Sequence, residues 1–214
     1  MAKTVHVIGN GDSAQLYQEE KNRKGLKLVC NLPPFEVPDQ YATCIVDFKM
    51  MQTIHKGEIM PPGEWILGMR PQVYCQQNPG FHMQIAGKIK EFYTRKPSYA
   101  KNYTDLNCGH MAVYFACQKL KADRVHLWGM DSIFDFNLRS YTDLVLPSDR
   151  GGMNNHRLSE NWRPLWKNMF DDFSDGRVEF ILHHFHDSLK FDVKDNVKIE
   201  VHSKKGLQKE KTAV

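Results

Sequence analysis

The sequence predicts an α/β protein with a doubly wound, mostly parallel, Rossmann-like sheet and a long lid loop. Short apolar runs typical of buried strands alternate with runs typical of helices, which favours parallel pairing through crossover helices. Two of the strand runs end in glycine turns, at residues 9–11 and 129–131. Of the 214 residues, 41% are hydrophobic, enough to bury one core without metal or disulfide staples.

The N-terminal half contains four expected strands, at residues 5–8, 26–30, 43–48 and 63–69. The first runs into Gly9-Asn10-Gly11, and the second stops at Asn31 shortly before two prolines. Residues 14–24 are polar and predict a short helix between these two strands. Residues 85–92 favour a helix, whereas the rest of 71–105 gives no clear pattern.

The C-terminal half begins with the clearest unit, in which Asn107-Cys108-Gly109 precedes a helical run over residues 110–121. A strand at 125–128 follows and ends in Gly129-Met130-Asp131. Residues 132–155 are polar and rich in turn formers, and a loop of this length is often functional. Apolar side chains then recur at helical spacing from 158 to 170. Strands are expected at 178–182 and, as an edge strand, at 197–201.

Composition favours one domain over residues 1–203, followed by a basic, flexible tail at 204–214. The net charge is +4, and the tail alone carries +3, so the body is nearly neutral. This argues against a basic nucleic-acid-binding face on the folded body, although the tail could contact a polyanion. The longest apolar run has seven residues, too short for a membrane span, and no signal peptide is expected. Five cysteines without a C-x-x-C pair favour a reducing, cytoplasmic location.

In doubly wound sheets, ligands bind beyond the carboxyl ends of the strands. This rule selects residues 9–13, residues 30–31, residues 130–132 and the loop that follows. Glycines at 9 and 11 would let the backbone approach a phosphate or sugar. The pattern is not G-x-G-x-x-G and lacks a Walker lysine, so a ligand-free turn is equally compatible with it.

Histidines suggest two further kinds of chemistry. His156 lies between the long loop and the last long helix, where a partly exposed imidazole could accept a proton. His183, His184 and His186 could form a metal cluster, but catalytic zinc usually takes three well-separated ligands. We therefore expect a polar sheet edge there and no metal site.

Taken together, these motifs resemble the bacterial sialyltransferases of the Campylobacter type. More loosely, they resemble other Rossmann-like proteins that use nucleotide sugars or transfer pyrophosphate to pterins. The resemblance extends over most of residues 4–185 and rests on the Gly-Asn-Gly turn, Cys30-Asn31, the Asn107-Cys108-Gly109 helix start, the Gly-Met-Asp turn and His156. The chain departs from the family pattern at Asp12, where the family has proline, at Cys108, where it has serine, and in its lid aromatics, with Phe134 or Phe136 near an expected tyrosine.

The resemblance implies specific roles. The donor nucleotide would contact Gly9, Asn10, Gly11, Ser13, Asn31, Asn107, Cys108, Gly109 and Asp131. Tyr141 in the lid, with Arg139 or Arg150, would stabilise the departing phosphate, and His156 would be the general base. No D-x-D metal motif is present, so the expected reaction is an inverting, metal-independent glycosyl transfer with no cofactor beyond the nucleotide-sugar donor.

Two alternatives remain open at this stage. A pyrophosphokinase-like enzyme would need Mg²⁺ held by Asp12, Asp47 or Asp131. A non-catalytic nucleotide-binding protein is the other. The acceptor could be a glycan, a protein or a modified nucleic-acid base, and the chain is compatible with a homo-oligomer.

Overall fold

The computed structural model describes residues 2–20, 23–134 and 155–203, without the side chains of 155–161. The predicted lid and the basic tail therefore lie outside the described residues, apart from the start of the lid. Within the described part, no helix is both long enough and apolar enough to cross a membrane. All five cysteines are buried free thiols.

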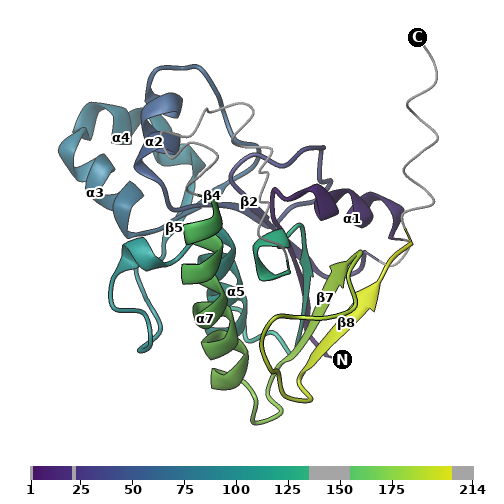
Figure 1. Ribbon diagram of the computed structural model, residues 1–214. Helices are drawn as coiled ribbons and strands as arrows, with labels where there is room; N and C mark the ends of the chain where they lie inside the picture. The colour runs from purple at the N-terminus through teal and green to yellow at the C-terminus, as the bar shows by residue number, and fades with distance from the viewer. Residues whose placement is uncertain (1, 21–22, 135–154, 204–214) are drawn as a thin grey trace.

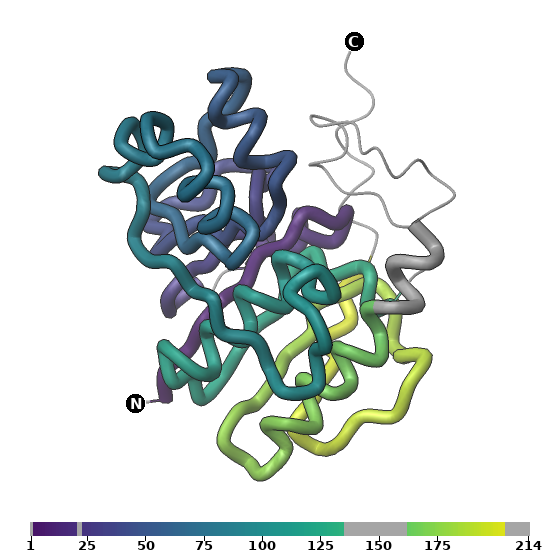
Figure 2. The backbone as a smooth tube through the Cα atoms, turned by 90° about the vertical axis from the view of Figure 1, so that its left-hand side faces the viewer, coloured from purple at the N-terminus to yellow at the C-terminus, as the bar shows by residue number. Residues whose placement is uncertain are grey.

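One sheet of eight parallel strands organises the chain, which confirms the predicted doubly wound α/β class (Figure 1). Its spatial order is β5-β4-β3-β2-β1-β6-β7-β8. The strands are β1 (Thr4–Ile8), β2 (Leu26–Cys30), β3 (Ala42–Ile45), β4 (Trp65–Leu67), β5 (Ile89–Phe92), β6 (Arg124–Trp128), β7 (Glu179–His184) and β8 (Val197–Val201). From β1 the chain winds outward to β5, then returns to β6 on the other side of β1. The switch point is therefore between β1 and β6, and Figure 2 shows β1 passing between the two halves.

Helices, most of them short, connect most of the strands. They are η1 (Asp12–Gln15), α1 (Leu16–Glu19), α2 (Phe48–His55), α3 (Met69–Gln77), α4 (Pro79–Ile85), η2 (Ala86–Lys88), η3 (Tyr103–Asp105), α5 (Cys108–Gln118), η4 (Asp131–Ile133) and α7 (Asn155–Asp172). Helices that return antiparallel to parallel strands begin at the carboxyl edge of the sheet. The starts of α5 and α7 are thereby brought to the edge at which ligands bind in this class.

The first face of the sheet carries the main core. Because side chains alternate along a strand, Val5 and Val7 face one side while His6 and Ile8 face the other. The first side packs against α5 and α7, whose buried residues include Phe115. Fully buried apolar side chains of this size stabilise a fold by about 1.5–3 kcal/mol each, so this layer holds the sheet to its helices.

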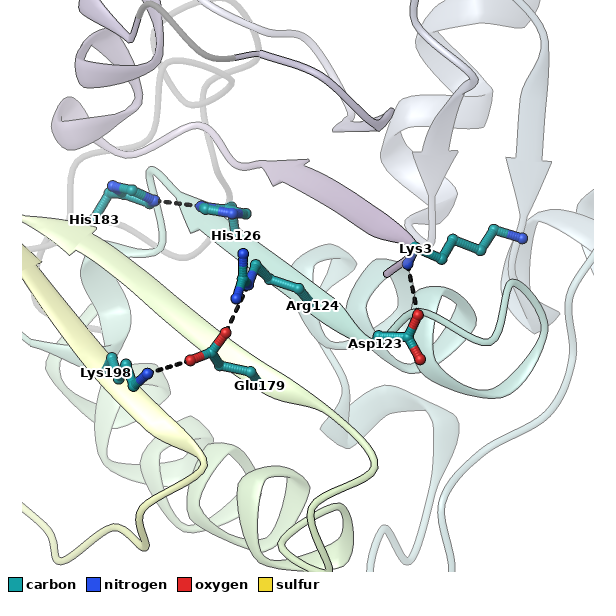
Figure 3. Close-up of polar contacts among 7 residues, drawn as sticks. All are labelled: Lys3, Asp123, Arg124, His126, Glu179, His183 and Lys198. Atoms are coloured by element: carbon teal, nitrogen blue, oxygen red, sulfur yellow. Dashed lines mark hydrogen bonds and ion pairs between the residues drawn. The ribbon is translucent and has the colours of Figure 1, made fainter. Parts of the chain in front are cut away.

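The second face is covered unevenly. Helices α2, α3 and α4 pack over β3 and β4, and η1 with α1 packs over β1, β2 and Trp128. Over β6–β8 this face instead bears polar side chains along much of its length, and among the described residues α1 reaches it only at Trp128. Glu179 on β7 pairs with Arg124 on β6 and with Lys198 on β8, as Figure 3 shows.

Several expected elements differ in the structure. The predicted helix over 85–92 is wrong, because Ile85 ends α4 and residues 89–92 form β5, which pairs with β4. The strand expected at 43–48 ends at Ile45, and Phe48 already belongs to α2. The expected helix over 14–24 is reduced to η1 and α1, since only Leu16 and Tyr17 offer it large apolar side chains to bury. The strand at 197–201 is confirmed as the edge, so His183 lies on an inner strand rather than at a sheet edge.

Candidate functional site

The turns after β1 and β6 are in direct contact at the switch point. The backbone N–H of Gly9 donates to Trp128 O at 2.7 Å, and that of Gly11 donates to Gly129 O at 3.0 Å. A Cβ atom on Gly9 would lie 2.6 Å from Gly129 O, and one on Gly11 would lie 2.5 Å from the Asp131 Cγ. Glycine is thus required at both positions by packing between the turns, independently of any ligand.

Asp131 joins the two turns to β7. Its Oδ2 accepts a hydrogen bond from the Ser13 backbone N–H at 3.2 Å, and its Oδ1 accepts one from the Ser13 hydroxyl. His184 Nε2 lies 3.5 Å from the same Oδ1, and Phe134 stacks on the His184 ring with a centroid separation of 4.0 Å. The carboxylate is 14% exposed and largely occupied by these partners. Its contacts fit a residue that positions the Gly9–Ser13 turn.

The start of α5 packs against both turns. Asn107 is its N-cap, and its Oδ1 accepts a hydrogen bond from the His110 backbone N–H at 2.9 Å. A Cβ atom on Gly109 would lie 2.7 Å from the Met130 sulfur, and one on Gly9 would lie 3.1 Å from it. Met130 therefore fills the space between α5 and the β1 turn, and a larger residue than glycine at 109 would require the Met130 side chain to move.

Cys108 and Asn31 connect this helix start to β2 and β3. The Cys108 thiol donates to Cys44 O at 2.8 Å. Burial, with the neighbouring Cys30 thiol, raises the pKa of Cys108 well above its usual value, so it is a protonated thiol and not a nucleophile. Asn31 has a φ of 53°, and its Oδ1 is buried without a hydrogen-bond donor among the described residues. A buried amide oxygen of this kind is an available acceptor for a ligand hydroxyl or amine.

The nine residues expected to bind a donor all lie at the carboxyl edge of β1, β2 and β6 or in the first turn of α5. Asn10 lies in the turn between the two glycines. Tyr141, Arg139 and Arg150 fall outside the described residues, and His156 is in the first turn of α7 with its side chain outside them. The partnership of His184 with Asp131 was missed. The sequence feature that could have indicated this contact is that His184 ends β7, the strand next to β6, and Asp131 lies in the turn after β6.

No protein-family model, curated protein or solved structure matches the chain. Any functional assignment must therefore be argued from the geometry and from the motifs.

The contact between the two turns can be tested with a matched pair of glycine substitutions. Gly129 has φ +66°, and its Cβ would lie 2.7 Å from the Ala14 Cβ, whereas Gly57 has φ +75° with no atom within 4 Å. Both Gly→Ala changes carry a left-handed backbone cost of about 1 kcal/mol. We expect Gly129→Ala to destabilise by a further 1–3 kcal/mol or so through overpacking. Urea unfolding that gave equal losses for both variants would contradict this packing.

His110 is a buried, neutral histidine close to the site. Its ring stacks on Trp166 with centroids 4.0 Å apart, and its Nδ1 accepts a hydrogen bond from the Asn107 backbone N–H at 3.4 Å. Burial lowers the pKa of His110 to about 3. Below pH 6.5 the unfolded chain takes up a proton that the folded chain excludes, so this group makes stability fall as the pH falls toward 3.

We expect His110→Gln to reduce this acid sensitivity. Glutamine at the third helical position can maintain the reciprocal capping box and does not titrate. Between about pH 6 and pH 4 the variant should lose stability less steeply than the wild type, by up to about 1.4 kcal/mol per pH unit. The measurement is urea unfolding of the variant and of the wild type across this pH range. A His110→Gln slope equal to that of the wild type would refute the assignment.

Proposed function

We propose that this chain is a glycosyltransferase that takes its sugar from a nucleotide-activated donor. The observation that carries the proposal is the convergence of the Gly9–Ser13 turn, Asn31 and the Asn107–Gly109 helix start at the switch point of a parallel sheet. This is where nucleotide-derived ligands bind in doubly wound folds. The motif resemblance to bacterial sialyltransferases supplies the class of reaction.

The donor would lie across the carboxyl ends of β1 and β2. Asn31 Oδ1 offers a buried acceptor to a hydroxyl or amine of the nucleoside. Asp131 is anionic and close to the turn, so it would disfavour a phosphate in direct contact and favour a hydroxyl there. We therefore propose that the nucleoside lies over β1 and β2, with the phosphate directed toward the start of α5, whose N-terminus favours an anion.

The chemical step would be an inverting displacement. The acceptor hydroxyl attacks the anomeric carbon as the bond to the donor phosphate breaks, and His156 takes the hydroxyl proton. General base catalysis of this kind contributes about 10²–10⁴-fold. Tyr141 would donate a hydrogen bond to the phosphate as its charge increases. The buried thiols Cys44 and Cys108 have raised pKa values and would take no part.

The Mg²⁺-dependent alternative is less well supported by the carboxylates at these strand ends. Asp47 pairs with Arg70 at 2.7 Å, and Asp131 is held by Ser13. These two of the three expected Mg²⁺ ligands therefore have part of their acceptor capacity already in use, whereas Mg²⁺ needs several oxygen ligands in near-octahedral geometry.

Nucleotide binding can be tested with two substitutions of matched backbone geometry. Asn31 and Asp39 both have φ 53°, so glycine is accommodated at either position. A thermal-shift panel of CMP, UDP, GDP and ADP should identify one nucleotide that raises the Tm. We expect Asn31→Gly to weaken its binding about tenfold or more through loss of the buried acceptor, while Asp39→Gly binds like the wild type. Equal affinities in the two variants, or no stabilising nucleotide, would count against the donor site.

The role of His156 is tested with the sugar conjugate of the nucleotide so identified. His156→Ala should lower transfer or donor hydrolysis by about 10²–10⁴-fold while the nucleotide still raises the Tm. His82→Ala on α4 is the control. Unchanged turnover in His156→Ala would remove this mechanism. Activity that is lost on chelation and restored by Mg²⁺ would instead favour the pyrophosphokinase-like enzyme, and binding without turnover would favour a non-catalytic protein.

A further inference from the structure

A row of histidines crosses the polar second face of the sheet, on the side of β6–β8 away from α5 and α7. His126 on β6 and His183 on β7 point toward each other in Figure 3, with His126 Nδ1 2.8 Å from His183 Nε2. The other ring nitrogen of His183, Nδ1, is 3.0 Å from His202 Nε2 and 3.4 Å from Glu200 Oε2. The His183 ring also stacks on Trp128 at 3.4 Å and 6°, which fixes its orientation.

Hydrogen bonds alone do not account for all the polar atoms gathered around His183 Nδ1. A neutral imidazole carries one N–H, and a carboxylate is only an acceptor. If His183 donates from Nε2 to His126, its Nδ1 can accept an N–H from His202, but the Glu200 carboxylate then faces an acceptor lone pair. If it instead donates from Nδ1, one proton can serve only one of the two neighbours.

We propose that His183, Glu200 and His202 bind a divalent transition metal ion, for which Zn²⁺ is the best fit. All three ligand atoms lie within 4.8 Å of one another. Zinc bonds to imidazole nitrogen and carboxylate oxygen are about 2.0–2.2 Å long, which places tetrahedral ligands roughly 3.3 Å apart. The separations of His183 Nδ1 from His202 Nε2, 3.0 Å, and from Glu200 Oε2, 3.4 Å, bracket that value. A cation satisfies all three lone pairs at once.

The surroundings have the features of a metal site beyond the ligands themselves. Metal-bound histidines almost always donate their second N–H to an acceptor that fixes the tautomer, and His126 Nδ1 is placed to be that acceptor for His183. The backbone N–H of His202 donates to His184 O at 2.9 Å, which anchors that ligand beside β7. The Glu200 side chain is 52% exposed, so a fourth position can be filled by water.

The metal would act as a clip for the edge strand. His183 is on β7, whereas Glu200 lies opposite it on β8 and His202 directly follows β8. One ion would therefore join the end of the edge strand to its inner neighbour. The site lies on the opposite face of the sheet from Asp131 and His184, so its metal binding can be tested separately from the proposed transferase function.

Cobalt and zinc test the site in the full chain. After chelator treatment and dialysis, Co²⁺ should give the visible d–d absorption of a four-coordinate site at one ion per chain, and Zn²⁺ should displace it. Zn²⁺ should also raise the Tm. We expect His202→Ala to weaken binding more than about 100-fold, beyond the 10–100-fold effect of outer-shell partners, and Glu200→Gln to weaken it in the same direction. Both changes are at residues that are not buried, which limits their effect on folding.

The matched controls are His82→Ala on α4 and Glu58→Gln after α2, and both should bind like the wild type. The proposal is overturned if the metal-free chain shows no d–d band and no Tm shift with micromolar metal. It is equally overturned if His202→Ala and Glu200→Gln bind metal as tightly as the two controls. Because the readout is metal binding and not turnover, failure of this proposal and failure of the transferase proposal are separate results.

Discussion

The contact between the β1 and β6 turns determines what the carboxyl edge of the sheet can contain. Gly9 and Gly129 approach so closely that a single added methyl group has no room on either. Their contact brings Asp131 under the Gly9–Ser13 turn and places Met130 against the start of α5. The site is therefore built from segments more than 100 residues apart in sequence, and no local preference could assemble it. Long-range packing of this kind is what converts a strand order into a binding edge.

The two faces of the sheet are covered differently. Both faces of a parallel sheet are normally covered by apolar layers, and here the first face and the β1–β4 part of the second follow that rule. Over β6–β8 the second face carries an ionic row at one level and a histidine row at the next. Exposed ion pairs such as Glu179–Lys198 contribute little to stability. Imidazoles packed against Trp128 are costly to bury unless their nitrogens are satisfied, so the histidine row demands a specific explanation.

The fold class could be predicted because alternating strand and helix patterns are local properties of the sequence. Residues 26–30 and 197–201 were predicted at their observed limits, since polar or turn-forming residues bound both strands. The strand at 89–92 was not recognised, because its polar Lys90 and Glu91 leave few apolar positions and its formation depends on pairing with β4. Likewise, the placement of Asn31 and the Gly9–Ser13 turn at one edge of the sheet followed from the ligand rule for strand ends, whereas Cys108 was expected there because of the motif resemblance. The approach of Glu200 and His202 to His183 could not be foreseen, because it depends on the register of β8 against β7.

Strand β7 links the candidate site and the histidine row through the simple alternation of its side chains. His183 and His184 are consecutive, so one ring points to Trp128 and the other to Phe134 and Asp131. Any force that moves the end of β7 acts on both sides of the sheet. A clip between β7 and β8 would hold His184 against Asp131, and Asp131 in turn holds Ser13 and the Gly9–Ser13 turn. The rigidity of the binding edge would then depend on an edge strand that does not touch it.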